Sequence, residues 1–267
     1  MLVPFLSKNL RQDLANIYAY CRWADDLADE SETPEEALQR LGIFETLLNR
    51  LFKGKKVKHP VFWALGETVE RHELEKKPFL DLISAFKQDQ VKSRYETFED
   101  LIDYCSRSAD PVGRLVLGCF DALDEENIYY SDLTCSGLQL TNFWADVGID
   151  LDKERIYIPA EDMRRFGITE EDLLEREMNP ELRDLLAFEV ERSRDWLLCG
   201  RKLLNRLGFF ASFSVDIFNS GGLGMLKKLK ENEYEVFACR CKLSKTDKYR
   251  ILFSAMGRLV GRQLGLQ

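Results

Sequence analysis

The chain has 267 residues, of which 45% are hydrophobic, and its formal net charge at pH 7 is −8. This composition supports a large core, and no break in it indicates a second domain, so we expect one domain over residues 1–267. The acidic balance argues against a nucleic-acid partner, and no apolar run reaches the roughly eighteen residues of a membrane span. Seven cysteines are scattered without a CxxC pair, which is typical of reduced thiols in a cytoplasmic protein.

The first half of the chain has apolar residues at helical spacing in five stretches. The second stretch opens with Thr33 as the N-cap and Pro34 at the first helical position, which is a strong start signal. The fifth is interrupted at Pro111, because a proline inside a helix removes a hydrogen bond and kinks the chain. The helices are expected at residues 10–30, 34–52, 61–76, 78–92 and 98–123.

The second half predicts further helices, beginning with a long one at 128–150. An extended segment then leads to Pro159, since the residue before a proline disfavours the helical conformation. Thr169 caps a later helix, and Asn179-Pro180 opens another. The other helices are expected at 161–166, 180–207, 209–230 and 249–264. No stretch alternates with a period of two, so the predicted fold class is all-α, in the form of a helical bundle.

One face of the helix at 128–150 carries a row of oxygen-bearing side chains. Gln139, Asn142, Asp146 and Asp150 follow one another at steps of three, four and four residues, which places them along one face. The apolar residues beside this row, which can pack against neighbouring helices, are Leu140, Phe143, Trp144 and Val147. A row of carboxylates and amides is repulsive unless a cation binds to it, and oxygen ligands favour a hard divalent cation.

A second acidic cluster ends the first helix, in the sequence RWADDLADE. Asp25 and Asp29 lie one turn apart, and Arg22 lies one turn before Asp25 and Asp26 and can pair with either. Acidic residues at a helix C-terminus oppose the helix dipole, so this placement is locally unfavourable. The cluster is either a binding site or a solvated helix end.

If the two clusters face each other across a bundle, four carboxylates converge, and two kinds of metal site come into question. A di-iron or di-manganese site requires Glu-x-x-His motifs on paired helices. The only histidines are His59 and His72, and neither follows a glutamate at that spacing. A site for Mg²⁺ and diphosphate remains, because Mg²⁺ keeps coordination positions open for phosphate oxygens.

The stretches YAYCRWADDLADE and LQLTNFWADVGIDLDKERIYIP resemble the two aspartate-rich signatures of the squalene/phytoene synthase family. The resemblance extends over most of the chain and implies an all-α isoprenoid synthase fold with a central cavity for prenyl chains. It also implies Mg²⁺ as the cofactor and a prenyl diphosphate as the substrate. Family members usually have a Ser/Asn-Phe segment before the first helix that helps to bind diphosphate. This chain begins MLVPFLSKNL and is expected to lack that segment or to have it shortened.

The resemblance implies roles for residues of both clusters. The implied Mg²⁺ ligands are Asp25, Asp29, Asn142, Asp146 and Asp150. The four aspartates and Tyr157 are the implied catalytic residues. The implied diphosphate-binding residues are Arg22, Gln139, Asn142 and Arg155. Nearer the C-terminus, the basic residues Arg240, Lys242 and Lys248 either close over the diphosphate or form a solvated basic face.

Within the family, the segments CSRSADPVGRLVL and TNFW resemble the hydroxysqualene synthases of bacterial hopanoid biosynthesis. Condensing synthases usually have Arg before the first aspartate of the second motif and Glu before the second, where this chain has Ala145 and Ile149. Ser106 likewise replaces a tyrosine of the condensing members. The implied reaction is ionisation of presqualene diphosphate, rearrangement of the cyclopropylcarbinyl cation and capture by water. It releases hydroxysqualene and diphosphate and needs no NADPH.

Two other functions are compatible with the resemblance. A condensing squalene or phytoene synthase would join two molecules of farnesyl or geranylgeranyl diphosphate. A non-catalytic assembly factor on the same fold would have no need of aspartates in both clusters, which argues against it. A peripheral contact with the inner membrane surface, for release of the product, is compatible with either enzyme.

Overall fold

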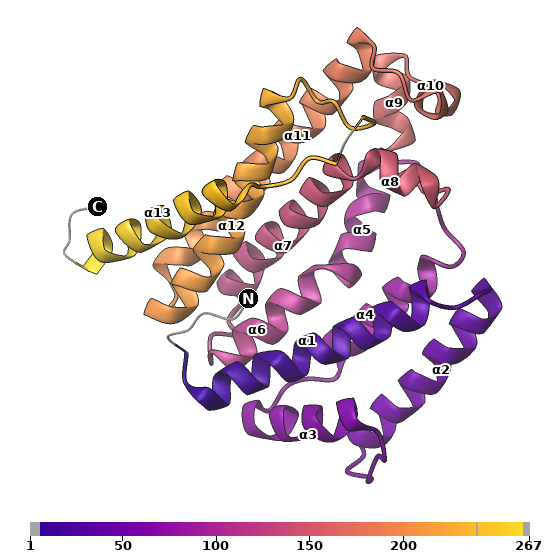
Figure 1. The fold of residues 1–267 in the computed structure, drawn as a ribbon. Helices are drawn as coiled ribbons and strands as arrows, with labels where there is room; N and C mark the ends of the chain where they lie inside the picture. The colour runs from indigo at the N-terminus through magenta and orange to yellow at the C-terminus, as the bar shows by residue number, and fades with distance from the viewer. Residues whose placement is uncertain (1–5, 239, 264–267) are drawn as a thin grey trace. The chain divides into compact units, whose positions relative to one another are not determined.

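The computed structural model describes residues 6–238 and 240–263, and in this part of the chain all regular secondary structure is helical (Figure 1). The predicted all-α class is therefore confirmed. No helix in the described residues is both long and apolar enough to cross a membrane. The cysteines within these residues are free thiols, as expected.

The helices form two compact units, and the chain passes between them more than once. Unit 1 comprises Met1–Lys92 and Ser106–Ile128, and unit 2 comprises Ser93–Cys105 and Tyr129–Gln267. Each unit is built from segments that are not continuous in sequence. The single domain expected over residues 1–267 stays a prediction.

Unit 1 is organised around an aromatic core. Its helices are α1 (Lys8–Asp29), α2 (Pro34–Leu51), α3 (Pro60–His72), α4 (Lys77–Gln88) and α6 (Asp110–Cys119). Tyr20 of α1 lies with its ring centroid 5.0 Å from Phe44 and 5.1 Å from Phe79, and its hydroxyl donates to the carbonyl of Phe79. Since Tyr20, Ala24 and Ala28 are buried, α1 turns this face to the core and leaves Asp25 and Asp29 on another face.

Capping contacts and backbone conformation explain where the helices of unit 1 begin and end. Thr33 caps α2 by accepting from the backbone N–H of Glu36, and Pro34 follows it, as predicted. α3 ends at His72, four residues earlier than expected, because Glu73 adopts a left-handed conformation with φ 48°. The predicted interruption near Pro111 is confirmed, since α5 ends at Ser108 and α6 begins at Asp110.

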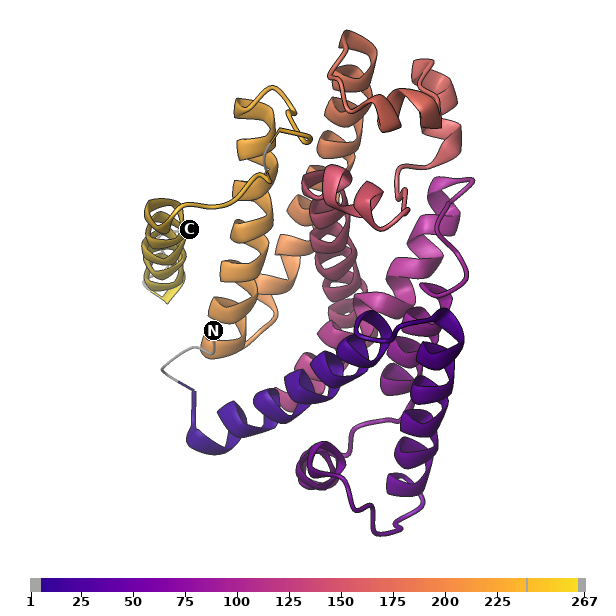
Figure 2. The ribbon, with the colours of Figure 1, turned by 45° about the vertical axis from the view of Figure 1, so that its right-hand side comes forward.

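The helices of unit 2 are α5 (Phe98–Ser108), α7 (Glu125–Ala145), α8 (Val147–Asp152), α9 (Ala160–Phe166), α10 (Glu170–Glu175), α11 (Pro180–Gly200), the 3₁₀ helix η1 (Arg201–Asn205), α12 (Phe209–Glu231) and α13 (Lys245–Gln263). Among them, α11 packs on α9, on η1 and on α12, which in turn packs on α13. The buried Trp144 donates from its indole N–H to the hydroxyl of Ser193, 2.7 Å away, which joins α7 to α11. A Cβ at Gly200 would lie 2.3 Å from the hydroxyl oxygen of Thr134, so glycine is needed at this close approach. α12 and α13 lie side by side in both views (Figures 1 and 2).

The continuous helix expected at 128–150 is wrong in one respect, because it is broken at Asp146. α7 ends at Ala145 and α8 begins at Val147, and Asp146 between them has φ −111° and ψ 12°. α8 therefore runs in a different direction from α7 (Figure 1). The α-type hydrogen bonds nevertheless continue, from Asp146 to Asn142 and from Asp150 to Asp146. The bend thus changes the direction of the chain without changing the four-residue steps of the acidic row.

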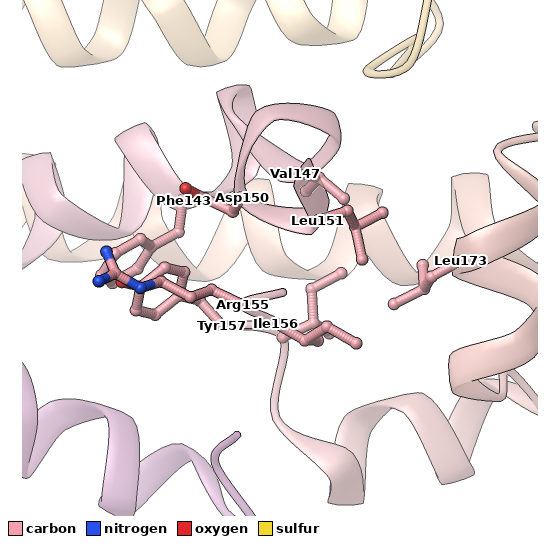
Figure 3. Close-up of a pocket in the computed structure, with 9 residues that line it drawn as sticks. Phe143, Val147, Asp150, Leu151, Arg155, Ile156, Tyr157 and Leu173 are labelled. Carbon is pink, nitrogen blue, oxygen red and sulfur yellow. The ribbon is translucent and has the colours of Figure 1, made fainter. Parts of the chain in front are cut away.

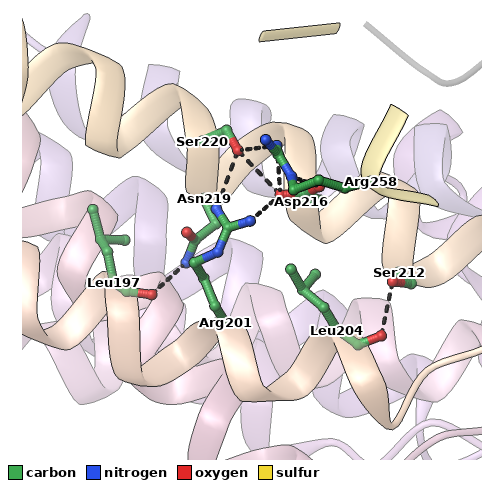
Figure 4. A network of polar contacts seen from close by, with 8 residues as sticks. All are labelled: Leu197, Arg201, Leu204, Ser212, Asp216, Asn219, Ser220 and Arg258. Atoms are coloured by element: carbon green, nitrogen blue, oxygen red, sulfur yellow. Dashed lines mark hydrogen bonds and ion pairs between the residues drawn. The ribbon is translucent and has the colours of Figure 1, made fainter. Parts of the chain in front are cut away.

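A buried ionic network joins η1, α12 and α13 (Figure 4). The carboxylate of Asp216, on α12, accepts from Arg201 at 3.0 Å and from Arg258 at 2.9 Å and 3.1 Å. Ser220 donates to the same carboxylate and accepts from both arginines. Only 4% of the Asp216 side chain is exposed, so its charge is offset by the two guanidinium groups rather than by water.

A second buried carboxyl group in unit 2 has fewer polar and charged partners than Asp216. Glu189 of α11 is fully buried, and neither of its carboxyl oxygens has a hydrogen-bond partner among the described residues. Arg192 is 3.8 Å away and is shared with Asp162, to which it donates at 2.9 Å. Burial raises the pKa of Glu189 to about 8. The charge of Arg192 opposes this shift, and that of Asp162 adds to it.

We therefore expect the Glu189→Gln variant to be more stable than the wild type at alkaline pH. In the unfolded chain the pKa of Glu189 returns to its ordinary value near 4.5, so the folded state binds more protons between pH 4.5 and 8. The free energy of unfolding of the wild type therefore falls as the pH rises through this range. Glutamine stays neutral throughout, and at pH 8 the variant should gain roughly 1–3 kcal/mol.

Urea unfolding measured from pH 4.5 to pH 8.5 tests this expectation. Glu191→Gln, on the exposed face of the same helix, is the matched control and should keep the wild-type pH dependence. Parallel stability curves for Glu189→Gln and wild type would show that Glu189 does not titrate in this range.

Candidate functional site

The predicted acidic row is accessible on the surface of unit 2. Asn142 is exposed, and Gln139, Asp146 and Asp150 are partly exposed. The neighbours predicted to pack are buried; they are Leu140, Phe143, Trp144 and Val147. The sequence therefore separates a polar face from a packed face, as the spacing predicts.

Asp146 and Asp150 influence each other electrostatically. Burial raises the pKa of Asp150 to about 7, and the negative charge of Asp146 adds to this rise, against the opposing charges of Arg155, Lys153 and Arg240. Two carboxylates that raise each other's energy in this way favour a bound cation, because it relieves their mutual repulsion.

A cation of the chain itself is bound to Asp146. Arg240 donates from Nε to Oδ1 at 2.7 Å and from Nη2 to Oδ2 at 2.6 Å, so both carboxylate oxygens are engaged by one guanidinium group. Arg240 lies 94 residues further along the chain, in the linker between α12 and α13. A planar fork of this kind is the strongest side-chain partner of a carboxylate.

The segment after α8 lines a small pocket beside Asp150 (Figure 3). The backbone N–H of Arg155 donates to the carbonyl of Asp150, and that of Ile156 donates to Ser93. These bonds direct Arg155 and Tyr157 toward the side of the pocket where Asp150 lies, while Leu151 and other apolar side chains form the opposite side. The pocket lining is Phe143, Val147, Asp150, Leu151, Arg155, Ile156, Tyr157, Ile158 and Leu173.

Aromatic stacking holds Tyr157 in place. Its ring is stacked on Phe143 with centroids 3.9 Å apart and 11° between the planes. Tyr95 stacks on Tyr157 at 5.7 Å, and Tyr104 lies 6.0 Å away. Such offset rings contribute about 0.5–1.5 kcal/mol per pair beyond the area that they bury. The structure therefore places Tyr157 in the same pocket lining as Asp150.

The first acidic cluster lies on unit 1, at the end of α1. Arg22 contacts Asp25 at 2.9 Å and Asp26 at 2.5 Å, so the predicted pairing is confirmed with both partners. Asp29 is the last residue of α1 and is exposed. The convergence of this cluster with the one on unit 2 stays a prediction, as does the central cavity.

The donor set of the acidic row suits Mg²⁺. Asn142, Asp146 and Asp150 offer only oxygen ligands, and a guanidinium cation is already seated on Asp146. Within residues 6–238 and 240–263, no three His, Cys, Asp or Glu side chains gather into a metal site. The row itself supplies two carboxylates and one amide, so water and phosphate oxygens would complete the coordination of a bound Mg²⁺.

Two features of the site lie outside what the local spacing predicts. The sequence indicates that Arg240 lies in a basic stretch, but nothing in it points to Asp146 as the partner. The second feature is the close contact at Gly148, where a Cβ would lie 2.9 Å from the backbone oxygen of Val236 in the linker before α13. Both contacts join segments that lie far apart in the sequence. The prediction that the N-terminal diphosphate-binding segment is absent or shortened concerns residues that include 1–5, which lie outside the described residues.

Comparison with known proteins identifies the family. A family model for squalene/phytoene synthase matches residues 1–247. The phytoene synthase of Arthrospira platensis is 31% identical over 240 residues, which cover 85% of this chain and 77% of that protein. The 15-cis-phytoene synthase of Synechocystis sp. is 32% identical over 239 residues, which cover 85% of this chain and 71% of that protein.

Solved structures agree with this result. The squalene synthase HpnC from Alicyclobacillus acidocaldarius is 38% identical, with a TM-score of 0.83, and the match covers 87% of this chain and 88% of that chain. A dehydrosqualene synthase in complex with a ligand is 25% identical, with a TM-score of 0.88, over 96% of this chain and 89% of that chain. The predicted isoprenoid synthase fold is thereby confirmed. Because the family model spans both aspartate clusters and most of the chain, this protein belongs to the squalene/phytoene synthase family.

Proposed function

We propose that the protein is a Mg²⁺-dependent hydroxysqualene synthase that converts presqualene diphosphate and water into hydroxysqualene and diphosphate. The proposal rests on the accessible row of Asn142, Asp146 and Asp150, in which the guanidinium group of Arg240 is bound to Asp146. A carboxylate row that attracts a cation is suited to binding the metal complex of a diphosphate.

The uncharged neighbours of the row favour this branch over condensation. Ala145 is buried, and Ile149 is exposed without a charge. Condensing members usually carry Arg and Glu at these positions, so the site of this chain has fewer charged groups with which to place a second diphosphate. The HpnC structure, at 38% identity, is described as a squalene synthase, so it supports the family and leaves the choice between the two reactions to the site residues.

The site residues would divide the reaction between them. Bound Mg²⁺ would neutralise the charge that develops on the leaving diphosphate. The C–O bond breaks and its electron pair leaves with the diphosphate, the carbon skeleton rearranges, and a water oxygen bonds to the cation and gives up a proton. Arg155 would bind diphosphate oxygens, and the stacked rings of Phe143 and Tyr157 would form an apolar wall beside Asp150.

A condensing squalene or phytoene synthase is the second candidate, because the curated relatives at 31–32% identity are phytoene synthases. Such an enzyme would take two prenyl diphosphates and release both diphosphates. A non-catalytic assembly factor would require neither the accessible row nor the arginine bound to it, and it is the weakest of the three.

Product analysis separates these functions. Purified protein with Mg²⁺ is given presqualene, farnesyl or geranylgeranyl diphosphate in turn, and the products are identified by mass spectrometry. We expect hydroxysqualene from presqualene diphosphate, and no product from the other two. A C30 or C40 hydrocarbon or its presqualene-type precursor from farnesyl or geranylgeranyl diphosphate would establish condensation instead. Release of ¹⁸O-labelled alcohol in H₂¹⁸O would confirm that water captures the cation.

A further inference from the structure

The guanidinium group of Arg240 occupies the carboxylate of Asp146 on the same oxygens that a metal ion would use. It engages Oδ1 and Oδ2 together, at 2.7 Å and 2.6 Å. The Asp146 side chain is 18% exposed, and that of Arg240 is 48% exposed. The ion pair is therefore accessible to solvent, and a divalent cation can reach Asp146 if the arginine moves aside.

The linker that carries Arg240 lies directly against α8. The backbone oxygen of Val236 approaches Gly148 so closely that a Cβ there would be 2.9 Å from it. Glu235 fixes the next turn, since its Oε1 accepts from the backbone N–H groups of Phe237 at 3.0 Å and Ala238 at 3.1 Å. Val236 itself is buried. These contacts hold the start of the linker against α8, a few residues before Arg240.

Unit 1, taken by itself, has the same kind of contact. Arg22 pairs with Asp25 and Asp26 at the end of α1. In each unit, therefore, an arginine supplies positive charge to an aspartate that is an expected metal ligand. A buried or crowded carboxylate gains from such a partner when no other cation is bound.

We propose that Arg240 is the counterion of the metal site while no metal ion is bound. A divalent cation displaces the guanidinium group of Arg240 from Asp146, and the diphosphate then binds that guanidinium group. The inference rests on the proposed function, because it takes Asp146 as a metal ligand. A guanidinium fork fits the oxygens of a phosphate as well as those of a carboxylate, so the displaced Arg240 finds a new partner when diphosphate arrives. Metal and diphosphate then strengthen each other's binding, because each favours the arrangement in which Arg240 has left Asp146.

The test measures metal and diphosphate binding separately in Arg240→Gln. Binding of Mn²⁺ alone is followed by the electron paramagnetic resonance signal of the free ion. Binding of labelled inorganic pyrophosphate is measured by equilibrium dialysis in excess Mg²⁺. We expect Arg240→Gln to bind Mn²⁺ about five- to tenfold more tightly than wild type, a difference of about 1–1.4 kcal/mol, and to bind pyrophosphate more weakly by a similar factor.

Lys245→Gln is the matched control, since it removes the same charge at an exposed position five residues further on, at the start of α13. It should shift Mn²⁺ affinity by less than twofold. A general electrostatic effect would change the Mn²⁺ affinity of both variants equally. Damage to the linker would weaken the binding of both Mn²⁺ and pyrophosphate in Arg240→Gln. Either outcome overturns the inference.

Asp146→Ala separates this inference from the proposed function. If Asp146→Ala weakens Mn²⁺ binding and Arg240→Gln leaves it unchanged, the counterion role is wrong and the metal site stands. If Asp146→Ala binds Mn²⁺ as tightly as wild type, the metal site proposed here is wrong, and the role of Arg240 falls with it.

Discussion

Asp146→Ala is expected to slow diphosphate release from presqualene diphosphate by about 10²–10³-fold, as removal of one preorganised charge-stabilising group does in other enzymes. Asp146 stands in the middle of the accessible row, and its two oxygens already bind a cation through Arg240. Without this carboxylate, the metal that would offset the charge of the leaving diphosphate loses a ligand. Phosphate release measured with a coupled pyrophosphatase assay gives the rate directly.

The fold should survive this substitution. Arg240 is half exposed, so losing its partner leaves a solvated guanidinium group rather than a buried unpaired charge. Asp152→Ala is the matched control, because Asp152 lies six residues further on in α8 with a 63% exposed side chain paired with Arg176. That control should turn over like the wild type. Equal rates for Asp146→Ala and wild type, with equal thermal stability, would remove Asp146 from the reaction.

Helix starts could be predicted from the sequence because the signals are local. Thr33 and Thr169 each accept from a backbone N–H three residues later, as their positions before acidic helical turns indicate. The start of α13 shows the limit of this approach. Apolar spacing places it near 249, whereas the capping contacts between Ser244 and Asp247 begin the helix at Lys245. A short polar cap therefore outweighed the apolar pattern.

Helix ends and bends were harder to predict. Glu73 takes a left-handed conformation that glycine usually adopts, so its sequence gives no warning that α3 stops there. The bend at Asp146 likewise lies inside an uninterrupted helical pattern. The end of α3 is closed locally, since the backbone N–H of Leu74 donates to the carbonyl of Val69. α8, by contrast, packs closely on the linker, where Val236 approaches Gly148.

Within the candidate site, residue spacing predicted the acidic row but not the residue that binds to it. The three- and four-residue steps from Gln139 to Asp150 follow from helix geometry alone. The pairing of Asp146 with Arg240 joins residues 94 positions apart, and no pattern in one sequence specifies such a contact. The stacking of Tyr157 on Phe143 is of the same kind, since the turn after α8 has to form before the two rings meet.

Asp216→Ala is expected to destabilise unit 2 by about 2–4 kcal/mol, because it takes a shared carboxylate away from two partly buried arginines. Arg201 and Arg258 are 23% and 28% exposed, so water screens part of their repulsion and the loss falls below that of a fully buried pair. For a protein of this size the thermal midpoint should fall by about 5–10 °C. Differential scanning calorimetry measures the shift, and Asp195→Ala, at an exposed position on α11, should leave the midpoint within 1 °C of wild type.

The same substitution should loosen α13 before the rest of unit 2 unfolds. Arg258 is the residue of α13 that binds Asp216, and through it the helix is joined to α12 and η1 (Figure 4). When that bond is lost, the linker ahead of α13, which is held between α12 and α13, becomes accessible to proteases more often. Limited trypsin digestion should therefore cut Asp216→Ala within residues 232–250 several-fold faster than wild type or Asp195→Ala. Because trypsin cleaves after arginine and lysine, the new fragments would map the loosened segment directly. Equal digestion patterns, together with an unchanged midpoint, would mean that α13 is held by its apolar packing on α12 and that the buried network contributes little.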